Sequence, residues 1–174
     1  ESIKIINSEI ETANKIINNL LDFTRVPSPV RISLNLNHLL MEALKKSVIP
    51  PGIDVVEDLS DSLYPTAVDA TQMTQIFLNL IENAVQAMDK GGTLTLSTSN
   101  LNDYVVVAIS DTGLGIPKSN LEKIFEPLFT TKDKGTGLGL SISYRLAEAN
   151  NASLEVKSTE GQGTVFTVRF RTGK

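Results

Sequence analysis

The chain has 174 residues, of which 41% are hydrophobic and 21% are charged, and its formal net charge is −4. This composition is typical of one soluble globular domain with an appendage, and it excludes both a basic nucleic-acid-binding surface and a polybasic membrane patch. The absence of Cys excludes a disulfide scaffold, a thiolate zinc site and a cysteine nucleophile.

The first 26 residues predict an amphipathic helix. Its apolar residues recur at alternating steps of three and four, as in a heptad seam: Ile3, Ile6, Ile10, Ala13, Ile17 and Leu20. Further apolar positions widen the seam and favour a helical bundle, with a helix lying on its own domain as the alternative. Pro27 and Pro29 end the helix and mark a linker at residues 27–30.

The sequence contains no segment that predicts targeting or membrane insertion. No stretch approaches the roughly 20 apolar residues of a transmembrane helix, and no signal peptide is visible. We therefore expect a cytoplasmic domain, with any membrane anchor in segments that this sequence lacks. Because the chain begins at Glu1 inside a helical pattern without an initiator Met, we expect it to be a fragment of a longer protein.

Residues 31–174 alternate strand and helix patterns. Strands are predicted at residues 31–37, 53–59, 64–68, 93–99, 104–109, 152–158 and 164–171, and helices at 38–48 (capped by Asn37), 69–88, 120–125 and 138–150. The continuous Val and Ile run at 104–109 is typical of a central strand that is buried on both faces. We expect an α/β fold, a two-layer sandwich whose mixed or mainly antiparallel sheet carries its helices on one face.

The helix predicted at residues 69–88 has an unusual polar face. At about 100° per residue, six polar residues share one narrow arc: Gln72, Gln75, Asn79, Glu82, Asn83 and Gln86. Asn is a poor helix-interior residue because its amide competes for backbone hydrogen bonds. A solvated face usually carries Lys, Arg and Glu instead. The arc therefore favours a binding face, with a solvated face as the alternative.

Two glycine-rich motifs lie in or at the ends of the long irregular stretch 110–139. Residues 111–116 (Asp-Thr-Gly-Leu-Gly-Ile) follow the predicted central strand, where a carboxylate can bind an amine-bearing ring; a tight turn is the alternative. Residues 135–140 (Gly-Thr-Gly-Leu-Gly-Leu) open a helix, where backbone N–H groups bind phosphate; a flexible hinge is the alternative. The second motif lacks the Gly-Lys-Ser/Thr ending of a P-loop.

The motifs occur in order within one domain, with the stretch Phe125-Glu-Pro-Leu-Phe129 between them. Together they resemble the ATP-binding domain of the sensor histidine kinases of two-component systems, within the superfamily that includes the gyrase, chaperone and mismatch-repair ATPases. The resemblance covers an N box (79–88), a G1 box (111–115), an F box (125–129) and a G2 box (135–140). It implies a Bergerat-type catalytic ATP-binding domain at residues 31–174. Residues 1–26 resemble the second helix of a dimerisation and phosphoacceptor hairpin.

The resemblance also implies roles for individual residues. Asn83 resembles the ligand of the Mg²⁺ ion that bridges the triphosphate, and Asn79 would support the same region. Asp111 resembles the carboxylate that binds the adenine amino group of ATP. The remaining predicted contacts belong to the base pocket (Gly113, Gly115, Ile116 and Thr164) and to the phosphate cradle (Gly135, Thr136, Gly137, Leu138, Gly139 and Leu140).

Two positions depart from the family pattern. Family members often carry Lys or Arg three residues after the metal-binding Asn and an aromatic residue one position later, where this chain has Gln86 and Ala87. We take Lys132 as the candidate for the missing phosphate cation, with a solvated surface Lys as the alternative. Glu82 could orient water or Mg²⁺, or act as a general base.

The implied reaction is transfer of the ATP γ-phosphoryl group to a histidine, for relay to a response regulator receiver domain. The only histidine is His38, which falls at the start of a domain helix, so the acceptor is expected on a hairpin helix that this fragment lacks. The implied full-length protein is a homodimer with no nucleic-acid partner. Two alternatives are another ATPase module of the superfamily and a docking module whose nucleotide site is vestigial.

Overall fold

The computed structural model describes residues 27–132 and 135–172. The elements follow the order β1 (Ile32–Leu34), α2 (Leu36–Lys46), β2 (Ile53–Asp58), β3 (Thr66–Val68), α3 (Ala70–Gln86), β4 (Gly92–Leu101), β5 (Tyr104–Asp111), α4 (Lys118–Leu121), α5 (Gly139–Ala149), β6 (Ala152–Thr159) and β7 (Gly163–Arg171). The predicted heptad helix, which resembles the second helix of a dimerisation and phosphoacceptor hairpin, covers residues 1–26, and these lie outside the described residues.

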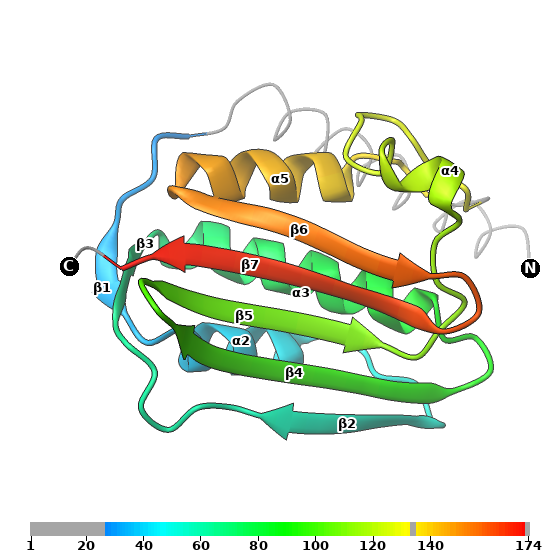
Figure 1. Ribbon diagram of the computed structural model, residues 1–174, viewed down its shortest axis with the longest axis horizontal. Coiled ribbons are helices and arrows are strands. Elements are labelled where there is room, and N and C mark those ends of the chain that lie inside the picture. Colours follow the sequence, from blue (N-terminus) through cyan, green and yellow to red (C-terminus); the bar gives the residue numbers. More distant parts are fainter. Residues whose placement is uncertain (1–26, 133–134, 173–174) are drawn as a thin grey trace, which may run out of the picture.

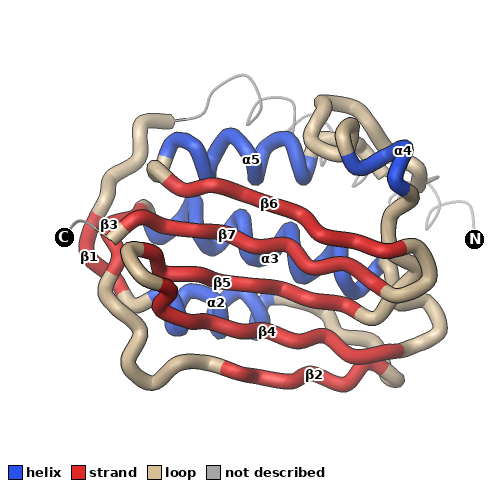
Figure 2. Tube along the Cα trace, viewed as in Figure 1, coloured by secondary structure: helices blue, strands red, loops and turns tan. Residues whose placement is uncertain are grey.

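A five-stranded sheet forms one layer of the molecule, and helices α2, α3 and α5 lie side by side on one of its faces (Figures 1 and 2). The strand order is β2-β4-β5-β7-β6, in which β2 runs parallel to β4 and every other pair is antiparallel. Strands β1 and β3 form a separate two-stranded antiparallel sheet. The predicted two-layer α/β sandwich with a mixed sheet is confirmed.

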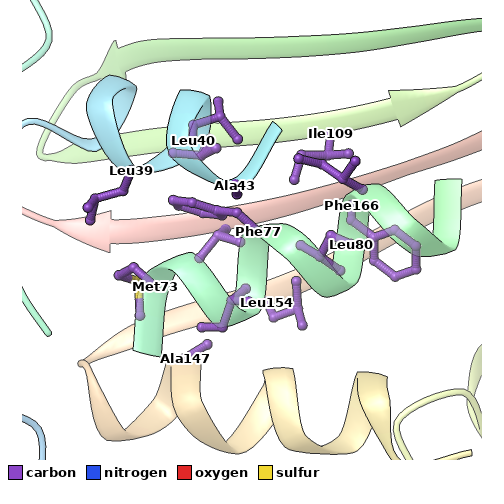
Figure 3. Close-up of a cluster of buried hydrophobic side chains, with 14 of the residues drawn as sticks. Leu39, Leu40, Ala43, Met73, Phe77, Leu80, Ile109, Ala147, Leu154 and Phe166 are labelled. Carbon is purple, nitrogen blue, oxygen red and sulfur yellow. The ribbon is translucent and has the colours of Figure 1, made fainter. Parts of the chain in front are cut away.

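The hydrophobic core lies between the sheet and the three helices, with α3 in the middle. Phe77 and Leu80 of α3 are fully buried against residues of α2 and of the sheet, including Leu40, Ile109 and Phe166 (Figure 3). Burial of such side chains drives folding, and removing an aromatic ring from such a core typically costs about 3–5 kcal/mol. The core therefore fixes α3, whose polar face points away from the sheet-side apolar cluster.

The predicted start of the first domain helix is wrong by two residues. Asn35, not Asn37, caps α2, because its extended backbone lets its side chain accept a hydrogen bond from the N–H of Asn37 at 2.9 Å. The Asn37 amide instead donates to the Ser60 carbonyl at 3.0 Å and accepts from the Thr98 hydroxyl at 2.8 Å. The asparagine chosen as a cap thus joins α2 to the sheet.

Two further predictions need correction. Strand β5 is not buried on both faces: Val105, Val107 and Ile109 are buried, whereas the alternate residues Val106 and Ala108 are only half-buried. The reason is that helices cover a single face of the sheet. The short helix expected at residues 120–125 is α4, which spans Lys118–Leu121. Among the described residues, no helix has the length and apolar content that crossing a membrane requires.

Candidate functional site

A cavity of about 680 Å³ opens beside the C-terminal half of α3. Its other walls come from the start of α5, the end of β5, the start of β7 and the segments at residues 115–132 and 135–137. The segments arrive from distant parts of the chain because the core holds α3, α5 and the sheet together. The cavity therefore collects the predicted motifs in one place.

The polar arc of α3 faces this cavity, with one exception. Five of its side chains line the wall: Gln75, Asn79, Glu82, Asn83 and Gln86. The exception is Gln72, which is buried near the beginning of the helix. Asn79 is held in place because its Nδ2 donates to the Ser143 hydroxyl of α5 at 2.9 Å. A Cβ atom on Gly139 would lie 2.3 Å from Asn79 Oδ1, so a larger residue at this position would displace the Asn79 side chain from its place between the two helices.

Helix α5 begins at the cavity wall without a side-chain cap. Its N-cap residue is Leu138, which makes no side-chain cap hydrogen bond, and Gly137 and Gly139 on either side line the cavity. The first N–H groups of a helix have no intrahelical partner and favour an anion. This end of the cavity is therefore suited to a phosphate or a carboxylate.

Asp111 brings a buried carboxylate to the cavity wall at the end of β5. The residue is 4% exposed and lines the cavity at the end of β5. Burial raises the pKa of its carboxyl, whereas hydrogen bonds from the backbone N–H groups of Gly113 and Thr164 and the charge of Lys132 act in the lowering direction. A carboxylate has more acceptor positions than these two donors fill, so Asp111 can accept a further N–H from a ligand.

Lys132 lines the cavity and contacts the polar face of α3. Its ammonium donates to Gln86 Oε1 at 2.7 Å and to Asn83 Oδ1 at 3.1 Å. The residue as a whole is exposed, but desolvation of the ammonium lowers its pKa, and the nearby carboxylates Asp111 and Asp89 oppose that shift. The structure thus brings a lysine to the helix position where Gln86 replaces the family's usual cation.

All but two of the predicted site residues line the cavity: Asn79, Glu82, Asn83, Asp111, Gly115, Ile116, Lys132, Gly135, Thr136, Gly137, Gly139, Leu140 and Thr164. Gly113 instead packs on the end of α3, since a Cβ there would lie 2.3 Å from the Ala87 carbonyl oxygen. The Leu138 side chain is 1% exposed and belongs to the hydrophobic core. Close packing around the cavity therefore explains why Gly113 and Leu138 occur in the motifs.

The sequence analysis missed several polar residues of the cavity wall. Ser143 lies one helical turn after Gly139 on α5 and lines the cavity, as do Asn120, Thr130 and Thr131. Spacing of four residues on a helix places Ser143 on the face of Gly139, and that signal was available. The F-box residue Phe129 also lines the cavity, whereas the Phe125 ring lies 5.3 Å from the Tyr144 ring.

The donor set of the cavity fits a Mg²⁺ ion only when a ligand supplies most of the coordination. Within the described residues, no three His, Cys, Asp or Glu side chains gather as a metal cluster. Asn83 and Glu82, which carry an amide oxygen and a carboxylate, are among the residues that line the cavity, and Mg²⁺ is commonly held by one or two protein oxygens together with substrate phosphates. The residues present therefore fit a metal that arrives with a phosphate-bearing molecule.

Comparisons with known proteins agree on one family. The family model for the histidine kinase-, DNA gyrase B-, and HSP90-like ATPases matches residues 68–174. Signal transduction histidine-protein kinase AtoS of Escherichia coli (strain K12) is 35% identical over 172 residues, which cover 97% of this chain and 28% of AtoS. The chain spans only 22–37% of the length of the first curated relatives that it matches.

Solved structures show the same architecture. Full-length ShkA in complex with AMPPNP is 27% identical with a TM-score of 0.80, over 91% of this chain and 36% of that one. Histidine kinase ThkA in complex with response regulator protein TrrA is 25% identical with a TM-score of 0.79, over 98% of this chain and 50% of that one. The similarity therefore extends from sequence motifs to the arrangement of helices and strands.

Proposed function

The chain belongs to the histidine kinase-, DNA gyrase B-, and HSP90-like ATPase family, and from this premise we propose that its cavity binds ATP with Mg²⁺. We further propose that the longer protein of which it is part transfers the γ-phosphoryl group to a histidine. The acceptor would lie on a helical hairpin of the same kinase, which would act as a homodimer and pass the phosphoryl group to a response regulator receiver domain.

The buried carboxylate of Asp111 is the observation that carries the proposal. It is 4% exposed, lines the cavity and has a raised pKa caused by burial. Such a desolvated carboxylate gains most from a ligand that donates an N–H to it, and adenine carries an exocyclic amine with that property. Perturbed carboxylates in clefts are enriched at functional sites.

The start of α5 and the Lys132 side chain support the triphosphate assignment. The uncapped start of α5 and the Lys132 ammonium both offer hydrogen-bond donors and positive charge to the cavity. Asn83 Oδ1 provides a neutral oxygen for a Mg²⁺ ion whose charge the phosphates would balance. Within this arrangement Asn79 holds α3 to α5, and Glu82 is the candidate to orient water or act as a base.

The position of His38 supports an acceptor outside this chain. His38 is exposed on α2 and is absent from the residues that line the cavity. Phosphoryl transfer depends on positioning and charge neutralisation, so the acceptor nitrogen must reach the γ-phosphate directly. We therefore expect the isolated chain to bind ATP without phosphorylating itself.

Calorimetric titration of a non-hydrolysable ATP analogue with and without Mg²⁺ tests the binding site. We expect Asp111→Asn to weaken binding about 10–100-fold, since a hydrogen bond to a charged group contributes about 1.5–3 kcal/mol. Asn83→Ala should reduce the gain in affinity that Mg²⁺ provides. Asp54→Asn removes an exposed carboxylate of β2 outside the cavity and serves as the control. Unchanged affinity in Asp111→Asn would contradict the proposed site.

Radiolabelled ATP and a separate phosphoacceptor hairpin test the reaction. Histidine labelling of the hairpin that disappears in Asp111→Asn supports the kinase proposal. ATP hydrolysis without histidine labelling would favour an ATPase module of the gyrase or chaperone type. Absence of Mg²⁺-dependent nucleotide binding by the unmodified chain would favour a docking module with a vestigial site.

A further inference from the structure

Two buried carboxamides lie away from the cavity, where the N-terminal end of α3 meets the C-terminal end of α5. Gln72, in the first turn of α3, is 6% exposed, and Asn150, the C-cap of α5, is 2% exposed. Neither lines the cavity. Burying an amide is costly unless its donors and acceptors find partners, so the partners show what these residues do.

The two amides bond to each other and to the first turn of α3. Asn150 Nδ2 donates to Gln72 Oε1 at 2.7 Å and to the Leu146 carbonyl at 2.9 Å. Asn150 Oδ1 accepts from the backbone N–H of Asp69 at 2.8 Å. The C-terminal end of α5 is thereby fastened to the N-terminal end of α3.

The remaining donor of this cluster holds the linker. Gln72 Nε2 donates to the Pro27 carbonyl at 2.9 Å, and Asp69 Oδ2 accepts from the Val30 backbone N–H at 2.9 Å. The guanidinium of Arg31 donates to the Ala149 carbonyl and to Asn151 Oδ1. Residues 27–31 are mostly exposed, so polar contacts and not apolar burial hold this segment beside the end of α5 (Figure 1).

We propose that Asp69, Gln72 and Asn150, together with Arg31 of the linker, form a linker joint, which fixes the direction in which the chain leaves the domain at Pro27. The buried Gln72 side chain donates a hydrogen bond to the carbonyl of Pro27, a residue outside the helices and strands. A residue that served only the core would not need this contact with the linker. The two prolines of the linker restrict its backbone further. The occupant positioned by the joint is the preceding segment of this same chain, residues 1–26.

The joint shares its two helices with the cavity. Helix α3 carries Gln72 at one end and Asn83 near the other, and α5 carries Asn150 at one end and Gly139 at the other. A linker fixed to the joint is therefore oriented relative to the nucleotide site. This inference rests on the proposed function where it concerns phosphoryl transfer, because transfer requires the acceptor and the γ-phosphate to meet in a narrow range of geometry.

Electron-spin distance measurements on the 174-residue chain test the joint directly. The chain contains no Cys, so introduced cysteines at Glu11 and Lys157 carry the only labels. We expect Gln72→Ala to broaden the distance distribution between the labels. Asn100→Ala is the matched control, because its amide also ties a loop to the sheet through Ser62 and Tyr64 but does not touch the linker. An unchanged distribution in Gln72→Ala, or equal broadening in the control, would overturn the joint.

A surface variant covers the case in which Gln72→Ala fails to fold. Arg31→Met removes only the guanidinium contacts to Ala149 and Asn151, and it should broaden the same distribution to a smaller extent. An Arg31→Met distribution identical to that of the unmodified chain would then overturn the joint.

Phosphoryl transfer provides the functional readout in the longer chain that carries the acceptor hairpin. We expect Gln72→Ala to slow transfer about tenfold or more while the affinity for an ATP analogue stays within about twofold of the unmodified value. A parallel loss of affinity and transfer would contradict a positioning role. Failure of the unmodified chain to bind nucleotide would refute the proposed function, whereas the label distances would still decide the joint.

Discussion

Helices α3 and α5 begin at opposite ends of the domain, and the two beginnings differ. Helix α3 starts at the linker joint, where the Asp69 side chain caps it by accepting from the Gln72 N–H at 3.0 Å. Helix α5 starts at the cavity, where Leu138 provides no side-chain cap. At the joint the protein supplies the partners of its own polar groups, whereas at the cavity it leaves helix N–H groups for a ligand.

The two ends also shift carboxyl pKa values in opposite directions. The pKa of Asp69 is lowered, chiefly by the hydrogen bond from the Gln72 backbone and also by those from Val30 and Thr71. The pKa of Asp111 is raised, chiefly by burial. The charge of Asp69 therefore stabilises the fold, whereas the charge of Asp111 is held at a cost to the fold. Such a cost is expected where a site is prepared for a ligand.

The largest effect should come from the close backbone packing beneath the cavity. A Cβ on Gly163 would lie 1.9 Å from the Asp111 carbonyl oxygen, and its φ is +106°. We expect Gly163→Ala to lower the free energy of unfolding by more than about 2 kcal/mol, because a left-handed conformation and a backbone clash add together. Gly161 in the same turn has a φ of +77° but no neighbouring atoms within 4 Å, so Gly161→Ala should cost only about 1 kcal/mol.

Urea denaturation of both variants measures this difference. Equal losses of stability in Gly163→Ala and Gly161→Ala would show that backbone conformation alone matters, and that close approach to Asp111 does not constrain the cavity end.

The sequence predicts the cavity end better than the joint, for a physical reason. Glycines that permit close approach and amides on one helical arc are local signals, so the motifs at residues 79–88, 111–116 and 135–140 could be identified, and all but two of the predicted site residues line the cavity. Gln72 lies on the same helical arc as Gln75 and Gln86 and has the same side chain as these two residues. Its environment differs from theirs because it bonds to Asn150, which is distant in the sequence. No local pattern predicts that pairing.

The errors in the fold have a similar origin. Asn35 and Asn37 are both suitable caps, and what separates them is that Thr98 and Ser60 of the neighbouring elements bind the Asn37 amide. The Val-rich run of β5 predicted burial on both faces, but whether a second helical layer covers the sheet is a property of the whole fold. Element types follow from local periodicity, whereas burial and cap choice follow from tertiary contacts.

Removing each carboxylate in turn should change the pH dependence of stability in opposite directions. Asp69, whose folded pKa is lowered, contributes stability that is present above its unfolded pKa of about 3.8 and is lost as the pH falls below it. Asp111, whose folded pKa is raised, holds its proton more tightly in the folded state, so the fold loses stability as the pH rises above about 3.8. Urea denaturation of Asp69→Asn and Asp111→Asn at several pH values measures both effects.

Relative to the unmodified chain, Asp69→Asn should become less stable as the pH rises towards 3.8. At pH 7 the deficit should reach about 1–2 kcal/mol, because an amide cannot accept from both Gln72 and Val30. Asp111→Asn should instead gain stability relative to the unmodified chain as the pH rises above 3.8. Difference curves of the same sign would refute the contrast between the two ends.

The smallest effect concerns Lys132, a loop residue whose ammonium lies beside Gln86 in the cavity. Because the residue is exposed, Lys132→Met should change the free energy of unfolding by less than about 0.5 kcal/mol.

The same substitution should affect nucleotide binding more strongly. The Lys132 ammonium contacts Asn83 Oδ1, the atom proposed to bind Mg²⁺, so the ammonium and the metal compete for that oxygen while both attract phosphate. Without Mg²⁺ the ammonium is the main compensating charge, and its loss should weaken binding of an ATP analogue about tenfold. With Mg²⁺ present the loss should be only about two- to threefold, since the metal then takes over that role. Lys118→Met, an exposed lysine of α4 outside the cavity wall, is the control in these titrations. Equal weakening with and without Mg²⁺ would show that Lys132 acts independently of the metal site.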